Sequence, residues 1–366
     1  MMNKMIVSNL AHRPLRSAIS VVAIALEVIL ILMIVGFALG VLNDSKARYA
    51  GIGADIIVLP PGSSNVITIS GAPMPVKIGE FIAKQPHVSV VSPVLIQIAA
   101  SGTFQQVYGI DFQSYQALRP FTFVAGGPFQ GPDDLIVDDV YPRGKNLKVG
   151  DEVTIVNHKF RIAGIVAHGK GARLYVPLGK LQDLNGVQGR TTAFYVKADD
   201  PSRADAVAAE IKGIPHMESY NVYAMREWLS LMTPDNIPML SSFIRIVIGI
   251  SMTIGIIVIF QAMYTAVMER TREIGVLKSL GASKLYIVNV ILRETTLLSV
   301  AGIVVGMAVS YVASQLISKR TTLPVQITAS WLFYATIIAI AGSLAGAIYP
   351  AFKAAQKDPI DALAYE

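Results

Sequence analysis

Four long apolar segments constrain this chain more than any other feature. Each exceeds the roughly 18 residues, uncharged or nearly so, that an α-helix needs to cross a bilayer. They cover residues 18–42, interrupted only by Glu27, then 246–268, 295–318 and 331–352. A cleaved signal peptide is the alternative for the first, but its 25 residues exceed the typical apolar core of about 7–15. The pattern predicts a membrane protein with four spans.

Composition agrees with this prediction. Charged residues make up 15% of the chain, whereas a soluble protein normally carries about 25%. The chain has no cysteine, which excludes disulfides, thiolate metal sites and cysteine nucleophiles. Its five histidines show no pair at metal-ligand spacing, which argues against a zinc site.

Basic residues set the orientation. By the positive-inside rule, the ten that flank the predicted cytoplasmic ends outweigh the two in the 319–330 loop, so both termini and the loop after the second span are predicted to be cytoplasmic. Residues 43–240 contain 18 basic and 18 acidic residues, so the net charge of +6 belongs to the membrane-flanking remainder. That excess fits anionic lipid headgroups, and we exclude nucleic-acid binding. The ten basic residues are Lys4, Arg13, Arg16, Arg270, Arg272, Lys278, Lys284, Arg293, Lys353 and Lys357.

The external region reads as α+β. Strands are predicted over 54–60 and 192–199, and helices over 75–86 and 201–213. The strands are expected to form one sheet that the helices cover on a single face. Residues 113–189 carry short strands parted by Gly, Asn and Pro and predict an inserted β subdomain. The fold class is therefore an α+β membrane protein with four transmembrane helices (1+3) and a large extracytoplasmic α+β domain, made of a split βαβ-type subdomain and an inserted small β subdomain.

The predicted boundaries follow from these patterns. The extracytoplasmic domain comprises a βαβ-type subdomain (43–112 and 190–225), the inserted β subdomain (113–189) and a stalk (226–240). The other segments are the N-terminus (1–17), the spans (18–42, 241–268, 287–318 and 331–352), the cytoplasmic segment (269–286), the external loop (319–330) and the C-terminus (353–366).

Few residues of the sequence suggest a catalytic, metal or nucleotide site. Asp133, Asp134, Asp138 and Asp139 resemble a calcium or catalytic cluster, but without glycine-centred ligand spacing we interpret them as solvated strand ends. The phosphate-binding pattern GxxxxGK[ST] is absent from the chain, so no ATP site of that kind is predicted.

The segment "ERTREIGVLKSLGASK" (269–284) is charged and lies between two spans. Ile274, Leu277 and Leu285 are predicted to share a helical face, Arg270 to pair with Glu273, and Gly281 to end the helix. This chemistry suits docking on a partner protein or lying in the lipid headgroups equally well.

This segment resembles the one after the second span in MacB/FtsX-type ABC-transporter permeases, R-x-x-E-I-G-x-x-x-x-x-G-A. The matching residues are Arg270, Glu273, Ile274, Gly275, Gly281 and Ala282. The C-terminus is similar to that family's ending, with Pro350, Ala351, Ala354, Pro359, Ala362 and Leu363 in place. Within the external region, "LKVGDEVTI", "FRIAGIV" and "LYVPL" are similar to the family's smaller β subdomain.

The resemblance implies a non-enzymatic permease subunit of the mechanotransmission type in the bacterial inner membrane. It implies a homodimer docked on separate ABC ATPase subunits, which would bind ATP and Mg²⁺, because no nucleotide-binding domain is fused to this chain. A periplasmic membrane-fusion adaptor is a further candidate partner. The implied coupling residues are Glu269, Arg270, Arg272, Glu273, Ile274, Gly275, Leu277, Lys278, Gly281 and Ala282.

Several functions stay open. The leading hypothesis is export or extraction of an amphiphilic or hydrophobic molecule. The alternative is an FtsX-like transducer that activates a periplasmic cell-wall hydrolase without transport, and a membrane enzyme is the weakest candidate because the sequence offers no plausible catalytic pair. Neighbouring genes for an adaptor or for a hydrolase would discriminate the first two.

Polar residues inside the spans are functional candidates. Glu27 lies about 15 Å along the first span, and Gln261 in the second is predicted to hydrogen-bond it. We favour a protonated acid that joins helices over a proton or substrate role. Two G-x-x-x-G motifs, Gly302 with Gly306 and Gly342 with Gly346, predict close helix packing.

Overall fold

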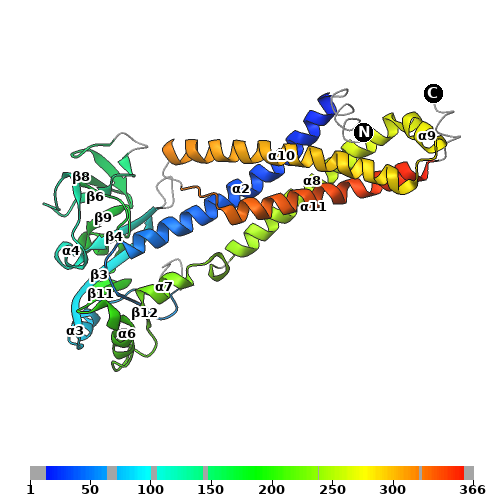
Figure 1. Cartoon of the computed structure of the whole chain (residues 1–366). Helices are drawn as coiled ribbons and strands as arrows, with labels where there is room; N and C mark the ends of the chain where they lie inside the picture. Colours follow the sequence, from blue (N-terminus) through cyan, green and yellow to red (C-terminus); the bar gives the residue numbers. More distant parts are fainter. Residues whose placement is uncertain are drawn as a thin grey trace. The chain divides into compact units, whose positions relative to one another are not determined.

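The computed structural model describes residues 14–63, 72–99, 105–142, 147–237, 239–320 and 324–357. The chain forms two compact units (Figure 1). The helical unit comprises residues 1–40, 239–319 and 323–366, and the α/β unit comprises residues 41–238 and 320–322.

Within the described residues, four long helices and one short one form the helical unit. The four long helices are long and apolar enough to cross a membrane, which confirms the predicted number of spans. The first does not end at Leu42 but continues to residue 50. The helices are α2 (Pro14–Ala50), α8 (Leu240–Glu269), α9 (Thr271–Ser279), α10 (Lys284–Arg320) and α11 (Ala329–Gln356).

Glycines allow these helices to approach closely. A Cβ atom at Gly306 of α10 would lie 2.8 Å from the Ala25 carbonyl oxygen of α2. A Cβ atom at Gly346 of α11 would lie 2.6 Å from the Ile256 carbonyl oxygen of α8. Real Cβ atoms do not approach backbone oxygens this closely, so only glycine permits the contacts. The predicted close packing is confirmed for Gly302 with Gly306 and for Gly346, whereas a Cβ atom at Gly342 would lie at an ordinary contact distance of 3.5 Å from its nearest neighbour.

The α/β unit is built on one continuous ten-stranded sheet. The strand order is β12-β1-β11-β3-β4-β9-β6-β8-β5, with β7 paired to β8, while β2 and β10 form a separate pair. The strands are β1 (Ile56–Leu59), β2 (Met74–Pro75), β3 (Val88–Ala99), β4 (Gln105–Ile110), β5 (Phe123–Gly126), β6 (Asp134–Asp138), β7 (Glu152–Ile155), β8 (His158–Val166), β9 (Leu174–Pro177), β10 (Arg190–Thr191), β11 (Ala193–Ala198) and β12 (Asn221–Ala224).

Helices cover both faces of this sheet, not one face as predicted. All four residues of β1 are buried, and a strand buried on both sides must be covered on both sides. Ile56 and Val58 join the core under α3 and α6, whereas Ile57 and Leu59 join a second core with α4, α7 and the end of α2. These helices are α3 (Ile78–Ala83), α4 (Phe112–Leu118), α6 (Ala204–Lys212) and α7 (Met225–Leu231), with short 3₁₀ turns at Pro201–Arg203 and Pro234–Asn236.

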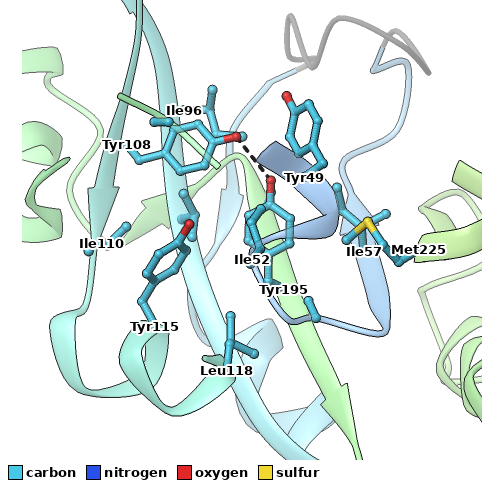
Figure 2. Packing of buried hydrophobic residues seen from close by; sticks show 14 of the residues in the cluster. Tyr49, Ile52, Ile57, Ile96, Tyr108, Ile110, Tyr115, Leu118, Tyr195 and Met225 are labelled. Carbon is cyan, nitrogen blue, oxygen red and sulfur yellow. Dashed lines mark hydrogen bonds between the residues drawn. The ribbon is translucent and has the colours of Figure 1, made fainter. Parts of the chain in front are cut away.

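The second core is rich in aromatic side chains (Figure 2). Tyr49 of α2 packs edge-on against Trp228 of α7, with ring centroids 4.5 Å apart. The hydroxyl oxygens of Tyr108 and Tyr195 lie 3.4 Å apart within the core. Burial raises the pKa of both hydroxyls, so both remain neutral hydrogen-bonding groups at any physiological pH.

The inserted segment contributes β6–β9 and α5 (Leu178–Asn185) to an apolar core that Leu95 of β3 and Val107 of β4 also join. It is joined to the main sheet as well, because β9 pairs in parallel with β4, with Val107 opposite Leu174. The strands of the insertion therefore extend the main sheet and do not stand apart from it.

The four aspartates of the insertion are ion-pair partners, and two of them are buried. This corrects the interpretation as solvated strand ends for Asp134 and Asp138, which are buried, whereas Asp133 is exposed as expected. Asp134 pairs with Arg161 at 2.9 Å, and Asp138 pairs with Arg173 at 3.4 Å. No group of three or more metal-ligating side chains occurs within the described residues.

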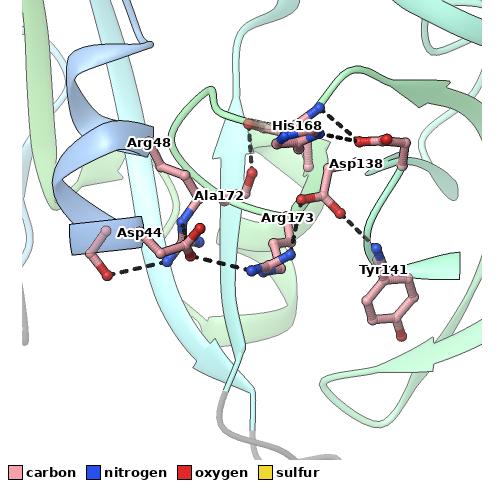
Figure 3. A network of polar contacts seen from close by, with 10 residues as sticks. Asp44, Arg48, Asp138, Tyr141, His168, Ala172 and Arg173 are labelled. Carbon is pink, nitrogen blue, oxygen red and sulfur yellow. Dashed lines mark hydrogen bonds and ion pairs between the residues drawn. The ribbon is translucent and has the colours of Figure 1, made fainter. Parts of the chain in front are cut away.

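Arg173 connects the insertion to the end of α2 (Figure 3). Its guanidinium contacts Asp44 of α2 at 3.2 Å as well as Asp138, and Asp44 also pairs with Arg48 at 3.1 Å. The Gly171 N–H donates to the Arg48 carbonyl at 2.7 Å. These contacts, which we call the α2 clamp, fix the last turns of α2 to the loop before β9.

Lys170 lies in the same loop and is 7% exposed. Its ammonium group donates to the Arg119 carbonyl and lies 3.9 Å from the Phe121 ring centroid and 4.8 Å from that of Tyr115. Burial, with a smaller contribution from the Arg119 charge, lowers the pKa of Lys170 to about 7.

We therefore expect the stability of the α/β unit to rise with pH. Between pH 7 and its ordinary pKa of 10.5, Lys170 binds more protons in the unfolded chain than in the folded one, so the free energy of unfolding increases by at most about 5 kcal/mol. Lys170→Met should remove this pH dependence. The measurement is denaturant unfolding followed by Trp228 fluorescence in a Trp331→Phe background. Lys159→Met, at an exposed lysine, should leave the pH dependence unchanged, and equal slopes in both variants would contradict the assignment.

Candidate functional site

The charged segment folds as the short helix α9 between α8 and α10 (Figure 1). The helix ends at Ser279, and Gly281 has a φ of +90°, a conformation that favours glycine. The Ala282 N–H donates to the Leu277 carbonyl at 3.0 Å, which closes the end of the helix. The predicted role of Gly281 as a helix stop is confirmed.

One side of α9 packs into the helical unit. Ile274 joins a core that includes Met263 and Val267 of α8 and Ile291 of α10. Gly275 is buried as well, and Leu277 and Ala282 are half-buried against this core. An apolar pocket of about 370 Å³ lies between the three helices. The predicted common face is therefore wrong, because Ile274 and Leu277 point inward while Leu285 lies on α10 and is exposed.

A buried ion pair anchors the start of α9. Arg270 contacts Glu294 of α10 at 3.0 Å, and their side chains are only 12% and 4% exposed. The predicted pair with Glu273 is wrong, since Glu273 faces solvent. Burial explains the choice of partner: Glu294 is charged and enclosed, so it needs a cation, whereas an exposed Glu273 is satisfied by water.

A second anchor holds the end of α9. The Lys278 ammonium donates to the Ala355 carbonyl of α11 at 3.0 Å and also to the Lys357 carbonyl. The last carbonyls of a helix lack partners within it, so a lysine there satisfies them and complements the helix dipole. Together the two anchors fix α9 to α10 and α11.

The outer side of this region carries exposed apolar residues. Leu280 is 81% exposed and Leu285 is 76% exposed, and the partly exposed Val276 and Tyr286 accompany them. We call these four residues the docking surface. Exposed charged residues border it: Glu269, Arg272, Glu273 and Lys284. Large apolar side chains beside charges are typical of sites for protein or membrane interaction.

The remaining candidates are placed separately. Glu27 is buried in α2, whereas Gln261 is exposed on α8, so the predicted hydrogen bond between them is wrong. The Glu27 carboxyl instead meets Gly255 and Gly342. Pro350 is buried within α11, and Pro359, Ala362 and Leu363 lie outside the described residues.

The fold thus defines a membrane protein with four candidate spans and a large α/β unit inserted after the first. Residues 17–214 match the MacB-like periplasmic core domain, and residues 245–359 match the FtsX-like permease C-terminal domain. The first match covers more than half of the chain. The chain therefore belongs to the MacB/FtsX-type ABC-transporter permease family, and its α/β unit is an extracytoplasmic domain.

Individual relatives agree with this membership. The chain is 31% identical over 63% of its length to the uncharacterized ABC transporter permease YknZ of Bacillus subtilis (strain 168), and 25% identical over 98% to the macrolide export ATP-binding/permease protein MacB of Bdellovibrio bacteriovorus. It spans 59% and 60% of the lengths of these two relatives. The uncharacterized permease YvrN of Bacillus subtilis is 25% identical over 96% of each chain.

The anchor at Arg270 gives a stability prediction. Arg270→Met leaves the buried Glu294 carboxylate without its cation, and we expect a loss of about 3 kcal/mol. The double variant Arg270→Met/Glu294→Leu should recover most of this loss, because it removes both buried charges. The measurement is denaturant unfolding with Trp331 as the sole tryptophan. Equal stability of wild type and Arg270→Met would show that the pair does not hold α9.

Proposed function

We propose that the protein is the permease subunit of an ABC system of the mechanotransmission type, and that it exports or extracts an amphiphilic or hydrophobic substrate. The docking surface supports this proposal most directly, because it places exposed apolar residues on α9, on the turn after it and on the start of α10, within the FtsX-like domain. A separate ABC ATPase would bind there and would hold ATP and Mg²⁺.

The anchors suggest how motion would pass into the membrane. A push on α9 acts on α10 through Arg270 and Glu294, and on α11 through Lys278. Because helices are stiff and their contacts close, the three helices would respond as one body. The ATPase drives this change only if ATP makes it bind one conformation more tightly than the other.

The α2 clamp supports transmission into the extracytoplasmic domain. Helix α2 runs without a break to Ala50, and Asp44 near its end contacts Arg173 of the insertion. A shift of α2 would therefore act directly on the strands that follow Arg173.

The assembly is proposed on the same basis. Two permease copies would pair in the bacterial inner membrane, with both termini and α9 on the cytoplasmic side, where the predicted basic excess lies. A periplasmic adaptor would complete an export system. The alternative, an FtsX-like transducer, would instead activate a cell-wall hydrolase on the extracytoplasmic side and would transport no substrate.

A docking variant tests the proposed ATPase contact. Leu280→Asp places a charge at the most exposed residue of the docking surface, and we expect at least a tenfold loss of ATPase co-purification and of permease-stimulated ATP hydrolysis. Glu273→Lys, which reverses a charge at its border, should weaken both to a smaller extent. Val124→Asp, at an exposed apolar residue of the α/β unit, is the matched control and should bind normally. Unchanged ATPase recovery with Leu280→Asp would reject this surface as the docking site.

A variant of the α2 clamp tests mechanical transmission separately. Asp44→Asn weakens the contacts with Arg48 and Arg173, so ATPase binding should persist while ATP-dependent movement of the α/β unit falls. The movement is followed by a spin label at a cysteine introduced in the insertion. Asp205→Asn removes an exposed pair with Arg226 and serves as the control. Full movement in Asp44→Asn would exclude the clamp from the transmission route.

A further inference from the structure

Glu27 is the one acidic residue within the apolar part of α2, and it is only 3% exposed. Both of its carboxyl oxygens are buried and have no hydrogen-bond partner among the described residues. The helix-joining hydrogen bond expected from the sequence is therefore absent from the described part of the chain. Something other than a direct polar contact must account for an acid at this position.

Two glycines form a notch that accommodates the carboxyl group. A Cβ atom at Gly255 of α8 would lie 2.1 Å from Oε2 of Glu27, and one at Gly342 of α11 would lie 3.5 Å from Oε1. Any larger residue at position 255 would therefore require the Glu27 carboxyl group to move. The notch fits the carboxyl group by shape but supplies no donor to it.

The nearby hydroxyl groups do not fill this role. Ser299 of α10 and Ser343 of α11 lie 2.6 Å apart and contact each other, and each also contacts a carbonyl of its own helix. Ser251 of α8 is buried one turn before Gly255, but no described contact links it to Glu27.

No described cation faces the carboxyl group either. The helices that pack on this part of α2 are α8, α10 and α11, through Gly255, Gly302, Gly306 and Gly342. Their nearest titratable side chains lie at least five residues along the helix from these glycines, or about 7 Å. They are Arg245 and Tyr264 on α8, Glu294 and Tyr311 on α10, and Tyr334 and Tyr349 on α11, while the nearest charges along α2 itself are Arg16 and Asp44.

An ionised carboxylate in this notch would have neither counter-charge nor hydrogen bonds, which is prohibitively costly in a low-dielectric interior. We propose that Glu27 is a proton-binding site of the transmembrane bundle, which holds a proton while α2 packs on α8 and α11 and releases it when this packing opens to water. The balance is simple: the carboxylic acid becomes a carboxylate and one proton enters the water. The inference goes beyond the proposed function, since it concerns the bundle whether or not an ATPase binds.

Proton release that is coupled to opening makes the conformation of the bundle depend on pH. If opening releases a proton, then raising the pH must favour the open packing by the same coupling. The protonation of Glu27 and the conformation of the bundle are therefore coupled, and each can be measured in the absence of transport.

Infrared spectroscopy tests the proton directly. A protonated carboxyl group has a C=O stretching band that a carboxylate lacks, so full-length protein in lipid vesicles is compared with Glu27→Gln near neutral pH. We expect a band in wild type that Glu27→Gln lacks, and that wild type loses as the pH is raised. Glu294, paired with Arg270, serves as an internal control and should contribute no such band. Identical spectra of the two proteins near neutral pH would overturn the proposal.

A second measurement tests the conformational link. Because the chain has no cysteine, spin labels can be placed by Leu30→Cys and Ile254→Cys at exposed positions of α2 and α8. The distance between the labels should change as the infrared band is lost, and Glu27→Gln should keep the low-pH distance throughout. Gly255→Ala, which crowds the carboxyl group out of its notch, should shift both changes to lower pH. A distance that stays constant while the band disappears, or that changes equally in Glu27→Gln, would overturn the link.

Discussion

The low dielectric of the helical bundle is the constraint on which the rest of this structure depends. It admits a charge only beside a partner, as with Arg270 and Glu294 at 3.0 Å. It also removes any hydrophobic gain from helix association, because lipid is as apolar as the side chains, so packing must come from close contact. Gly302 and Gly306 provide that contact between α10 and α2, and Gly346 provides it between α11 and α8.

In the α/β unit the constraint is that both faces of the central sheet must be shielded from water. Its central strands are buried on both faces, so helices must cover both, and the end of α2 contributes Leu42 and Tyr49 to one of these covers. The same helix therefore belongs to a membrane span and to a soluble core. This dual membership requires the α2 clamp, because the last turns of α2 carry Asp44 and Arg48, whose charges need partners once they are partly enclosed.

Two kinds of feature were predictable from the sequence: those set by the composition of long segments, and those set by a special backbone conformation. The four spans follow from apolar length, and the end of α9 follows from Gly281. Sequence-based prediction was wrong where the direction or the partner of a side chain depends on tertiary packing. The apolar residues of α9 differ in burial: Ile274 and Leu277 pack into the core, whereas Val276 lines the same pocket but stays 44% exposed, so periodicity alone did not identify the exposed side. The partner of Arg270 lies on the next helix, and a local i, i+3 rule does not detect it.

The anchors of α9 also decide how a partner can act on it. Breaking a buried ion pair by removing its partner costs about 3–5 kcal/mol, and each charged hydrogen bond of Lys278 contributes about 1.5–3 kcal/mol more. Moving a two-state equilibrium from 1:99 to 99:1 requires about 5.5 kcal/mol. The anchors of α9 are therefore of the same order in free energy as a large shift between two states, and they hold α9 to α10 and α11. A load on Leu280, which follows α9, or on Leu285, at the start of α10, would therefore act on α9, α10 and α11 together, as the proposed function requires.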